Sequence, residues 1–171
     1  RAIRLGAARG ATVFGTAGSE EKCEACERLG AARAINDRRE DFVSVVDELT
    51  GGAGVNVVLD MVGGEYIPRN ISALADQGIH VSIAVLMSSW VQLNIREIMI
   101  KRLWLTGSTL RPRSVAEKGE IGDALQREVW PLVEAGRVRP VVHATFPLAA
   151  AGEAHALMEE GSHIGKIVLE M

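Results

Sequence analysis

Apolar and polar positions along the chain form blocks that predict strands alternating with helices. Apolar residues recur on one face of residues 41–49, a helical spacing for which Asp41 is a suitable N-cap. Residues 55–62 are nearly continuous apolar sequence, which is typical of a parallel strand covered on both faces. This alternation predicts right-handed β-α-β units and a parallel sheet, with helices at residues 1–9, 19–29, 41–49, 67–75 and 93–101 and strands at residues 13–16, 34–36, 55–62, 80–86 and 103–108.

The pattern changes after residue 108. Pro112 keeps a basic loop out of a helix, Ser114 is placed to cap the long helix that follows, and Pro131 is expected to interrupt that helix. The remaining elements have no obvious place in the same parallel sheet, so we expect them to belong to a second domain. They are a helix at residues 114–135, a strand at 141–146, a helix at 149–160 and a strand at 165–170.

Composition restricts the class of protein and of partner. The 171 residues suffice for one domain, or one domain with an appendage, and 47% hydrophobic with 24% charged residues is typical of a globular protein. The net charge of −3 gives no electrostatic reason to expect nucleic acid or an anionic membrane as partner. No apolar run approaches the roughly 20 residues needed to span a bilayer, and no signal peptide is recognisable. We therefore expect a cytoplasmic protein.

Residues 12–22 carry the first candidate chemistry, because a short apolar run there ends in small residues and Ser19 opens a helix. In dinucleotide folds that prefer NAD, an acidic residue at the end of the second strand of the fold binds the ribose 2′-hydroxyl. The strand at residues 13–16 would be that second strand. Here Ala17, Gly18 and Ser19 occupy that place, with Lys22 one turn further on. A hydroxyl, exposed amides and an ammonium suit a 2′-phosphate, so the segment predicts NADPH. The alternative interpretation is an ordinary turn with Ser19 as N-cap.

Two cysteines, Cys23 and Cys26, form a C-x-x-C pattern inside the expected helix 19–29. Such a pair can be a redox site or half of a zinc site. A redox pair normally lies at a helix N-terminus, whereas this pair lies at least one turn in. There is no second cysteine pair, and the four histidines are scattered along the chain. We therefore interpret both cysteines as reduced thiols near a buried helix face and expect no metal site.

The glycine fingerprint of dinucleotide folds is missing from the chain. Only Gly6 and Gly10 precede the strand at residues 13–16, and both lie at the wrong end of the first helix to meet a pyrophosphate. The chain also begins with Arg1, in the middle of an expected helix. We interpret it as a fragment that lacks the first strand and the glycine turn of such a fold.

Polar and small residues at the expected strand ends are further candidates. Asp60, near the end of a buried strand, is best interpreted as a carboxylate bonded to backbone near a cofactor cleft, because no histidine or serine is placed to act with it. Gly63 lets a ligand approach the backbone, since it has no Cβ. Arg111 and Arg113, in a loop beside a strand end, either pair with phosphate or with acidic side chains, or are simply solvated, and the same alternatives apply to Lys166 just before the last strand.

Several segments together resemble the quinone oxidoreductase branch of the medium-chain dehydrogenase/reductase superfamily, over essentially the whole chain and in the right order. They read ARGATVFGTAGSEEK, CERLGA, GVNVVLDMVGG, GSTLRPRS and HIGKIVLEM. The resemblance implies an α/β fold: a Rossmann-like, doubly wound parallel sheet without its first strand and glycine turn at residues 1–107. Residues 108–171 would then be the C-terminal return into a GroES-like catalytic domain.

The resemblance also implies roles for individual residues. Ser19 and Lys22 match positions that hold the adenosine 2′-phosphate, with Gly18 beside them, and Gly63 matches the turn that faces the adenosine and pyrophosphate. The remaining cofactor-binding positions, which line the nicotinamide or lie near the cofactor, are Ala84, Val85, Leu86, Ser108, Thr109, Leu110 and Lys166. One departure is Asp37, where the family usually has a tyrosine, and an acid there would weaken NADPH binding. No catalytic acid or base is identified.

The reaction implied by the resemblance is hydride transfer from NADPH to a quinone or a related conjugated carbonyl, without zinc. Pairing of the edge strand at residues 102–108 would give a homodimer. Three alternatives remain open: an enoyl or 2-alkenal reductase of the same superfamily, a non-catalytic NADPH-binding module, and a zinc alcohol dehydrogenase.

Overall fold

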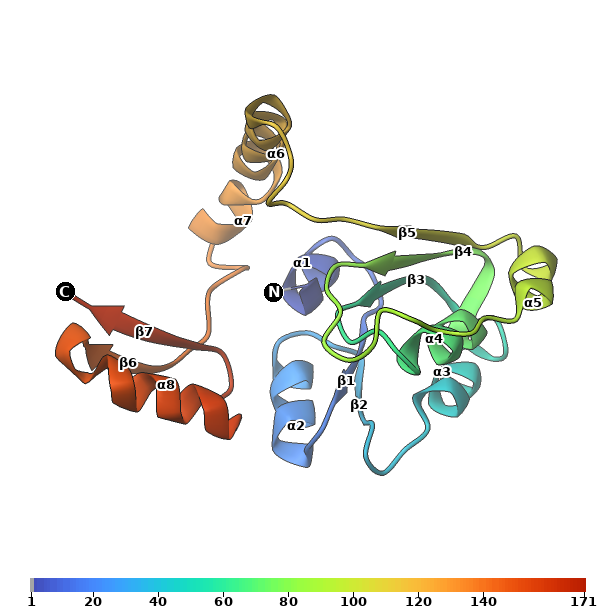
Figure 1. Ribbon diagram of the computed structural model, residues 1–171, viewed down its shortest axis with the longest axis horizontal. Helices are drawn as coiled ribbons and strands as arrows, with labels where there is room; N and C mark the ends of the chain where they lie inside the picture. Colours follow the sequence, from blue (N-terminus) through green and yellow to red (C-terminus); the bar gives the residue numbers. More distant parts are fainter. Residues whose placement is uncertain (1) are drawn as a thin grey trace. The chain divides into compact units, whose positions relative to one another are not determined.

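The computed structural model describes residues 2–171, and Arg1, the expected start of the first helix, lies outside the described residues. The chain divides into two compact units (Figure 1), one made of residues 1–34 together with 123–171 and the other of residues 35–122. The predicted domain boundary near residue 107 concerns the domains of an intact protein and stays a prediction.

Helices and strands follow one another in nearly the order that the sequence predicts. The helices are α1 (Ala2–Ala8), α2 (Glu20–Arg28), α3 (Phe42–Thr50), α4 (Tyr66–Ala73), α5 (Ile95–Ile100), α6 (Val115–Glu128), α7 (Trp130–Glu134), the short 3-10 helix η1 (Leu148–Ala150) and α8 (Ala151–Glu160). The strands are β1 (Phe14–Ala17), β2 (Arg33–Asn36), β3 (Val55–Asp60), β4 (Leu74–Ser82), β5 (Trp104–Gly107), β6 (Val142–Pro147) and β7 (Lys166–Glu170). None of the helices at residues 2–171 has the length and apolar character that crossing a membrane requires.

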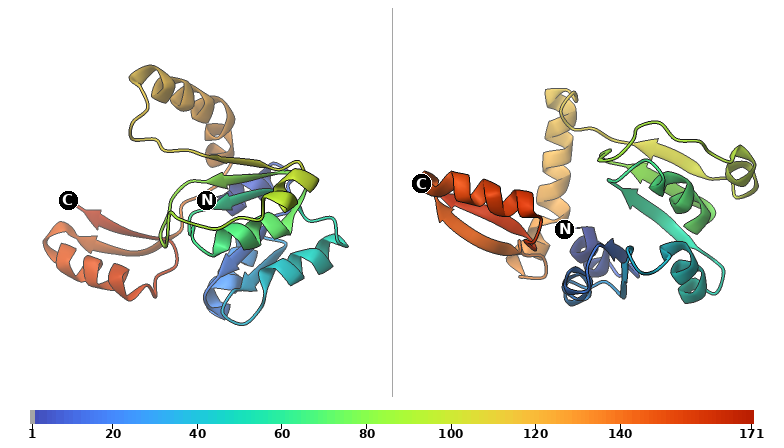
Figure 2. Two further views of the ribbon diagram at one scale, coloured as in Figure 1. Left: turned by 45° about the vertical axis from the view of Figure 1, so that its right-hand side comes forward. Right: turned by 60° about the horizontal axis from the view of Figure 1, so that its bottom comes forward.

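A parallel sheet in the order β3-β4-β5 forms the framework of the unit at residues 35–122. Figure 2 shows these three strands side by side. In the central strand, Val81 lies opposite Leu59 of β3 and Thr106 of β5. Because the strands run the same way, their carboxyl ends meet at one edge of the sheet. The loops that follow residues 60, 82 and 107 all leave from that edge.

Only one face of this sheet is well covered. Helix α4 packs against β3 and β4, and Ile71 and Leu74 are fully buried there. On the other face, Val57 and Leu59 keep 57% and 51% of their surface exposed. The prediction that residues 55–62 are covered on both faces is therefore wrong for β3: its alternate side chains lie in two different environments.

The largest error in the predicted boundaries concerns β4, which covers Leu74–Ser82 instead of residues 80–86. The chain passes from α4 directly into the strand, so the predicted helix at 67–75 also ends too late. Ser82 is the last paired residue of β4, and the N–H of Ile83 donates the last hydrogen bond of the parallel ladder, to the carbonyl of Asp60 at 2.8 Å. Ala84, Val85 and Leu86 therefore lie in a loop beyond the strand and not at its end.

Local capping signals account for the boundaries that were predicted well. The Asp41 carboxylate accepts hydrogen bonds from the N–H groups of Val43 and Ser44 at the start of α3. Gly51 ends that helix in the left-handed conformation, with φ of 60°, which glycine adopts without strain. Pro131 lies in the first turn of α7, where it separates α7 from α6 as predicted.

In the unit made of residues 1–34 and 123–171, β6 and β7 pair in parallel with each other, and α8 contacts both strands (Figure 1). This confirms that the C-terminal tail stands outside the β3-β4-β5 sheet. Helix α1 is tied to the C-terminal segment by long side chains. Arg9 bonds Glu128 at 2.9 Å, and Arg4 donates to the carbonyl of Arg139 at 2.7 Å.

Candidate functional site

Ser19 and Lys22 lie at the start of α2, as the sequence predicts. Ser19 is the N-cap, and its Oγ accepts a hydrogen bond from the N–H of Lys22 at 3.3 Å. The Lys22 ammonium donates to the carbonyl of Gly161 at 2.6 Å, which leaves two of its three N–H donors for a ligand. The exposed Glu20 and Glu21 follow in the first turn and reduce the positive potential there. This helix start therefore offers an anion three kinds of donor, namely a hydroxyl, backbone amides and one ammonium. The two neighbouring carboxylates act against anion binding.

The turn after β3 is shaped by the buried carboxylate of Asp60. Its Oδ1 accepts from the N–H of Val62 at 2.8 Å, and its two oxygens accept from the N–H of Gly63 at 3.3 and 3.2 Å. Gly63 has φ of 74°, and a Cβ there would meet Val85 Cγ1 at 3.0 Å and the carbonyl oxygen of Ser88 at 3.1 Å. The prediction that Asp60 bonds backbone is confirmed. Only glycine fits this turn, because its φ is positive and residues 85 and 88 of the next loop pack against it.

His80 and Asn70 complete a buried polar cluster with Asp60. His80 Nε2 lies 3.5 Å from Asp60 Oδ2 and 3.4 Å from Asn70 Nδ2, and each of the three residues is at most 6% exposed. Burial lowers the pKa of His80, although the Asp60 carboxylate works in the opposite direction. The lowered pKa favours a neutral His80 imidazole, which lies beside the Asp60 carboxylate that shapes the Gly63 turn. The expectation that no histidine is placed to act with Asp60 is therefore wrong. Sequence reasoning missed the cluster because its members lie 10 and 20 residues apart on three elements.

The loops after β4 and β5 leave from the same edge of the sheet as the Gly63 turn. The N–H of Leu86 donates to the carbonyl of Val62 at 3.0 Å, and that of Ser108 donates to the carbonyl of Ser82 at 3.0 Å. This edge of the unit at residues 35–122 carries seven of the predicted cofactor-binding residues, namely Gly63, Ala84, Val85, Leu86, Ser108, Thr109 and Leu110. The other four, Gly18, Ser19, Lys22 and Lys166, belong to the other unit, where Lys166 is exposed at the start of β7.

Arg113 stabilises the loop after β5. Its guanidinium donates to Ser108 Oγ at 3.1 Å, to the carbonyl of Thr109 at 3.2 Å and to the Glu117 carboxylate at 3.2 Å. Glu117 in turn accepts from Ser114 at the start of α6, and these hydrogen bonds lower the pKa of Glu117. The pairing of Arg113 with an acidic side chain, one of the alternatives considered for it, is confirmed by its contact with Glu117.

Asp37, the departure from the family pattern, is bonded to the hydroxyl of Tyr66 at the start of α4. This bond is the main cause of a raised pKa for Tyr66. The Tyr66 ring stacks on Phe42, with centroids 5.9 Å apart, and the Arg69 guanidinium lies 4.3 Å above the Phe42 ring. Arg69 also pairs with Asp41 at 2.9 Å. The carboxylate of Asp37 is thus held in a network of side chains, which sequence reasoning did not foresee.

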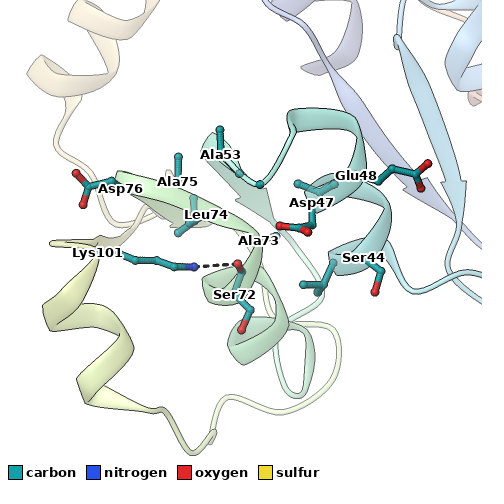
Figure 3. A pocket seen from close by; sticks show the side chains of 14 residues that line it. Ser44, Asp47, Glu48, Ala53, Ser72, Ala73, Leu74, Ala75, Asp76 and Lys101 are labelled. Carbon is teal, nitrogen blue, oxygen red and sulfur yellow. Dashed lines mark hydrogen bonds between the residues drawn. The ribbon is translucent and has the colours of Figure 1, made fainter.

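A large open hollow lies at the opposite edge of the sheet, by the amino ends of β3 and β4 (Figure 3). Its volume is about 940 Å³, and its walls include Asp47, Asp76 and Lys101. The Lys101 ammonium donates to the carbonyl of Ser72, in the last turn of α4, at 2.9 Å and pairs with the Glu97 carboxylate at 3.2 Å. Lys101 therefore caps the C-terminal end of α4. This hollow is separate from the candidate cofactor edge.

The two cysteines carry no sign of redox or metal chemistry. Burial raises the pKa of both Cys23 and Cys26, which disfavours the thiolate that either role requires. Among residues 2–171, no three His, Cys, Asp or Glu side chains lie close enough together to hold a metal ion. The described residues therefore do not fit a zinc site.

Comparison with known proteins gives consistent matches. The family described as zinc-binding dehydrogenase matches residues 29–169. A 2-haloacrylate reductase from a Burkholderia species is 34% identical over 165 residues, which are 94% of this chain and 48% of that protein. The chain thus spans about half the length of this relative.

Solved structures agree with the sequence match. The quinone oxidoreductase of Escherichia coli in complex with NADPH is 28% identical and superposes with a TM-score of 0.82, over 99% of this chain and 52% of that one. An NAD-dependent alcohol dehydrogenase is 33% identical with a TM-score of 0.81, over 99% of this chain and 47% of that one. The predicted α/β, Rossmann-like fold class is confirmed by these superpositions.

Proposed function

The chain belongs to the zinc-binding dehydrogenase family, with relatives in the quinone oxidoreductase branch of the medium-chain dehydrogenases/reductases. We therefore propose that the intact protein is an NADPH-dependent quinone oxidoreductase. Its reaction is hydride transfer to a quinone or a related conjugated carbonyl. The observation that carries the proposal is the combination of family membership with a glycine turn and a serine-capped helix start at the positions that the resemblance assigns to cofactor.

In this proposal the residues of the chain bind and orient the cofactor, and bound NADPH supplies the hydride. Ser19 Oγ and the free N–H donors of Lys22 hold the 2′-phosphate by charge-assisted hydrogen bonds. The Gly63 turn, fixed by Asp60, admits the adenosine and pyrophosphate part close to the backbone. Residues 84–86 and 108–110 line the nicotinamide, and Lys166 lies near the cofactor. Catalysis then rests on orientation and exclusion of water.

A second candidate is reduction of a conjugated carbon–carbon double bond, as in an enoyl or 2-alkenal reductase. The observation that favours it is the 34% identity to a 2-haloacrylate reductase, whose name describes reduction of an unsaturated acid. The two reactions share the cofactor and differ in the acceptor. A non-catalytic NADPH-binding module is the third candidate.

We also propose that the intact protein forms a cytoplasmic homodimer through β5. This strand has a neighbour, β4, on only one side within its sheet, and Trp104 is 69% and Leu105 41% exposed. An unpaired, apolar edge strand is suited to pairing with a second copy.

The test is oxidation of NADPH by the intact protein, followed by absorbance, with a small quinone in one cuvette and an enone in the other. Rapid loss of NADPH with the quinone, and much slower loss of NADH, is the expected result. Turnover of the enone alone assigns the second candidate, and saturable binding without any turnover assigns the third. Absence of both binding and turnover contradicts the proposal as a whole.

A further inference from the structure

A second hollow, of about 520 Å³, lies within the unit made of residues 1–34 and 123–171. Its lining residues are Arg4, Ala7, Ala8, Arg28, Leu29, Gly30, Gly136, Arg137 and Arg139. Four of these nine side chains are arginines, and no described lining residue is acidic. Such a concentration of positive charge is unexpected in a chain whose net charge is −3.

Backbone contacts explain the positions of two of the four guanidinium groups. Arg4 donates to the carbonyl of Arg139 at 2.7 Å, and Arg137 donates to the carbonyl of Ala8, the last residue of α1, at 2.8 Å. A cation at a helix C-terminus is favourable in itself, so Arg137 has a structural role. Each guanidinium has five N–H donors, so both keep donors for a ligand.

The other two arginines have no such role. The side chain of Arg139 has no ion pair among those found in residues 2–171, and its guanidinium lies against Gly136. Arg28 has only a 3.5 Å contact with Glu24, and both of these side chains are about two-thirds exposed. Like charges that converge on one hollow repel one another. A bound anion would relieve that repulsion.

Small residues are also part of the lining of the hollow. Gly30 and Gly136 both have positive φ, and a Cβ on Gly136 would meet the Arg139 guanidinium at 2.7 Å. A side chain at that position would therefore displace the guanidinium. A lining of small residues and arginines leaves room for a ligand that accepts several hydrogen bonds at once.

We propose that this arginine-lined hollow binds a small multivalent oxyanion of the phosphate class. The planar guanidinium fork matches phosphate oxygens with two parallel hydrogen bonds, and several forks together favour a ligand with more than one phosphoryl group. The volume lies within the range of small-molecule sites. The residues of this hollow are different from all the residues proposed to bind the cofactor.

The test is calorimetric titration of the intact protein, saturated with NADPH, with inorganic tripolyphosphate in one arm and adenosine triphosphate in the other. The double variant Arg28→Gln/Arg139→Gln removes the two guanidinium groups that have no structural role. The control variant Arg96→Gln/Arg127→Gln removes the same charge from exposed positions outside the hollow. A further variant, Lys22→Gln, reports any binding of phosphate at the cofactor site.

We expect one tripolyphosphate per chain for the wild type, the control and Lys22→Gln, and affinity at least about tenfold weaker for Arg28→Gln/Arg139→Gln. Equal affinity for both ligands assigns free oligophosphate, and tighter binding of adenosine triphosphate assigns a phosphate carried by a nucleoside. The proposal is overturned if the wild type shows no saturable binding, or if the control loses as much affinity as the hollow variant. Loss in Lys22→Gln alone would move the binding to the cofactor site.

Discussion

Replacing Asp60 by asparagine tests how the Gly63 turn is held. The carboxylate is 4% exposed and receives N–H bonds from Val62 and Gly63, with His80 Nε2 3.5 Å away. In Asp60→Asn, the amide oxygen can keep the 2.8 Å bond to Val62. The amide nitrogen then replaces Oδ2, which accepted from the N–H of Gly63 at 3.2 Å, so Gly63 keeps only its 3.3 Å bond to the amide oxygen.

The loss is one hydrogen bond to a charged acceptor, with a donor placed against the Gly63 N–H, which we expect to cost about 1.5–3 kcal/mol of stability. Relief of the buried charge offsets only part of this cost. Urea denaturation measures the loss, and hydrogen exchange at the amide of Gly63 shows whether it is local. The control, Asp76→Asn, alters an exposed pair with Arg102 and is expected to cost less than about 1 kcal/mol. Unchanged stability and unchanged Gly63 exchange in Asp60→Asn would refute this explanation of the turn.

Three further predictions follow from buried or strained groups. Burial lowers the pKa of His80 below its ordinary 6.5, so the unfolded chain binds the proton more readily than the folded chain. The stability that His80 contributes is therefore complete above pH 6.5 and is lost as the pH falls below that value. His80→Asn should flatten this pH dependence of stability, by up to about 1.4 kcal/mol per pH unit, in denaturation curves measured from pH 7 to 5. Tyr66 is the only tyrosine of the chain, so alkaline absorbance titration should show its raised pKa, and Asp37→Asn should return that pKa towards 10. Gly54→Ala should lower thermal stability by about 2 kcal/mol or more, since its Cβ would lie 2.7 Å from the backbone nitrogen of Ala75, whereas Gly122→Ala, in open space on α6, should be neutral or stabilising.

Much of the fold could be predicted because its signals are local. Asp41 and Gly51 mark the two ends of α3, and Pro131 separates α6 from α7. These residues act on backbone groups within one turn of themselves, so a short window of sequence contains both partners. The same holds for Ser19, whose capping of α2 was expected.

The errors concern features that depend on distant partners. The start of β4 at Leu74 is set by pairing with Val55, and its end at Ser82 by pairing with Asp60, the last residue of β3. The exposed face of β3 likewise depends on which elements lie on the sheet. In the candidate site, the partnership of Asp60 with His80 could not be predicted, because strand register alone brings those two residues together.

The central claim of this account is that the start of α2 recognises the 2′-phosphate of NADPH. The most direct test is the dissociation constant of the intact protein for NADPH and for NADH, measured by fluorescence titration with wild type and with Ser19→Ala/Lys22→Gln. The wild type should bind NADPH clearly more tightly than NADH. In the double variant, NADPH should bind about tenfold or more weakly while NADH binding is unchanged. Equal affinity of the wild type for both cofactors, or the same loss for both in the variant, would contradict it.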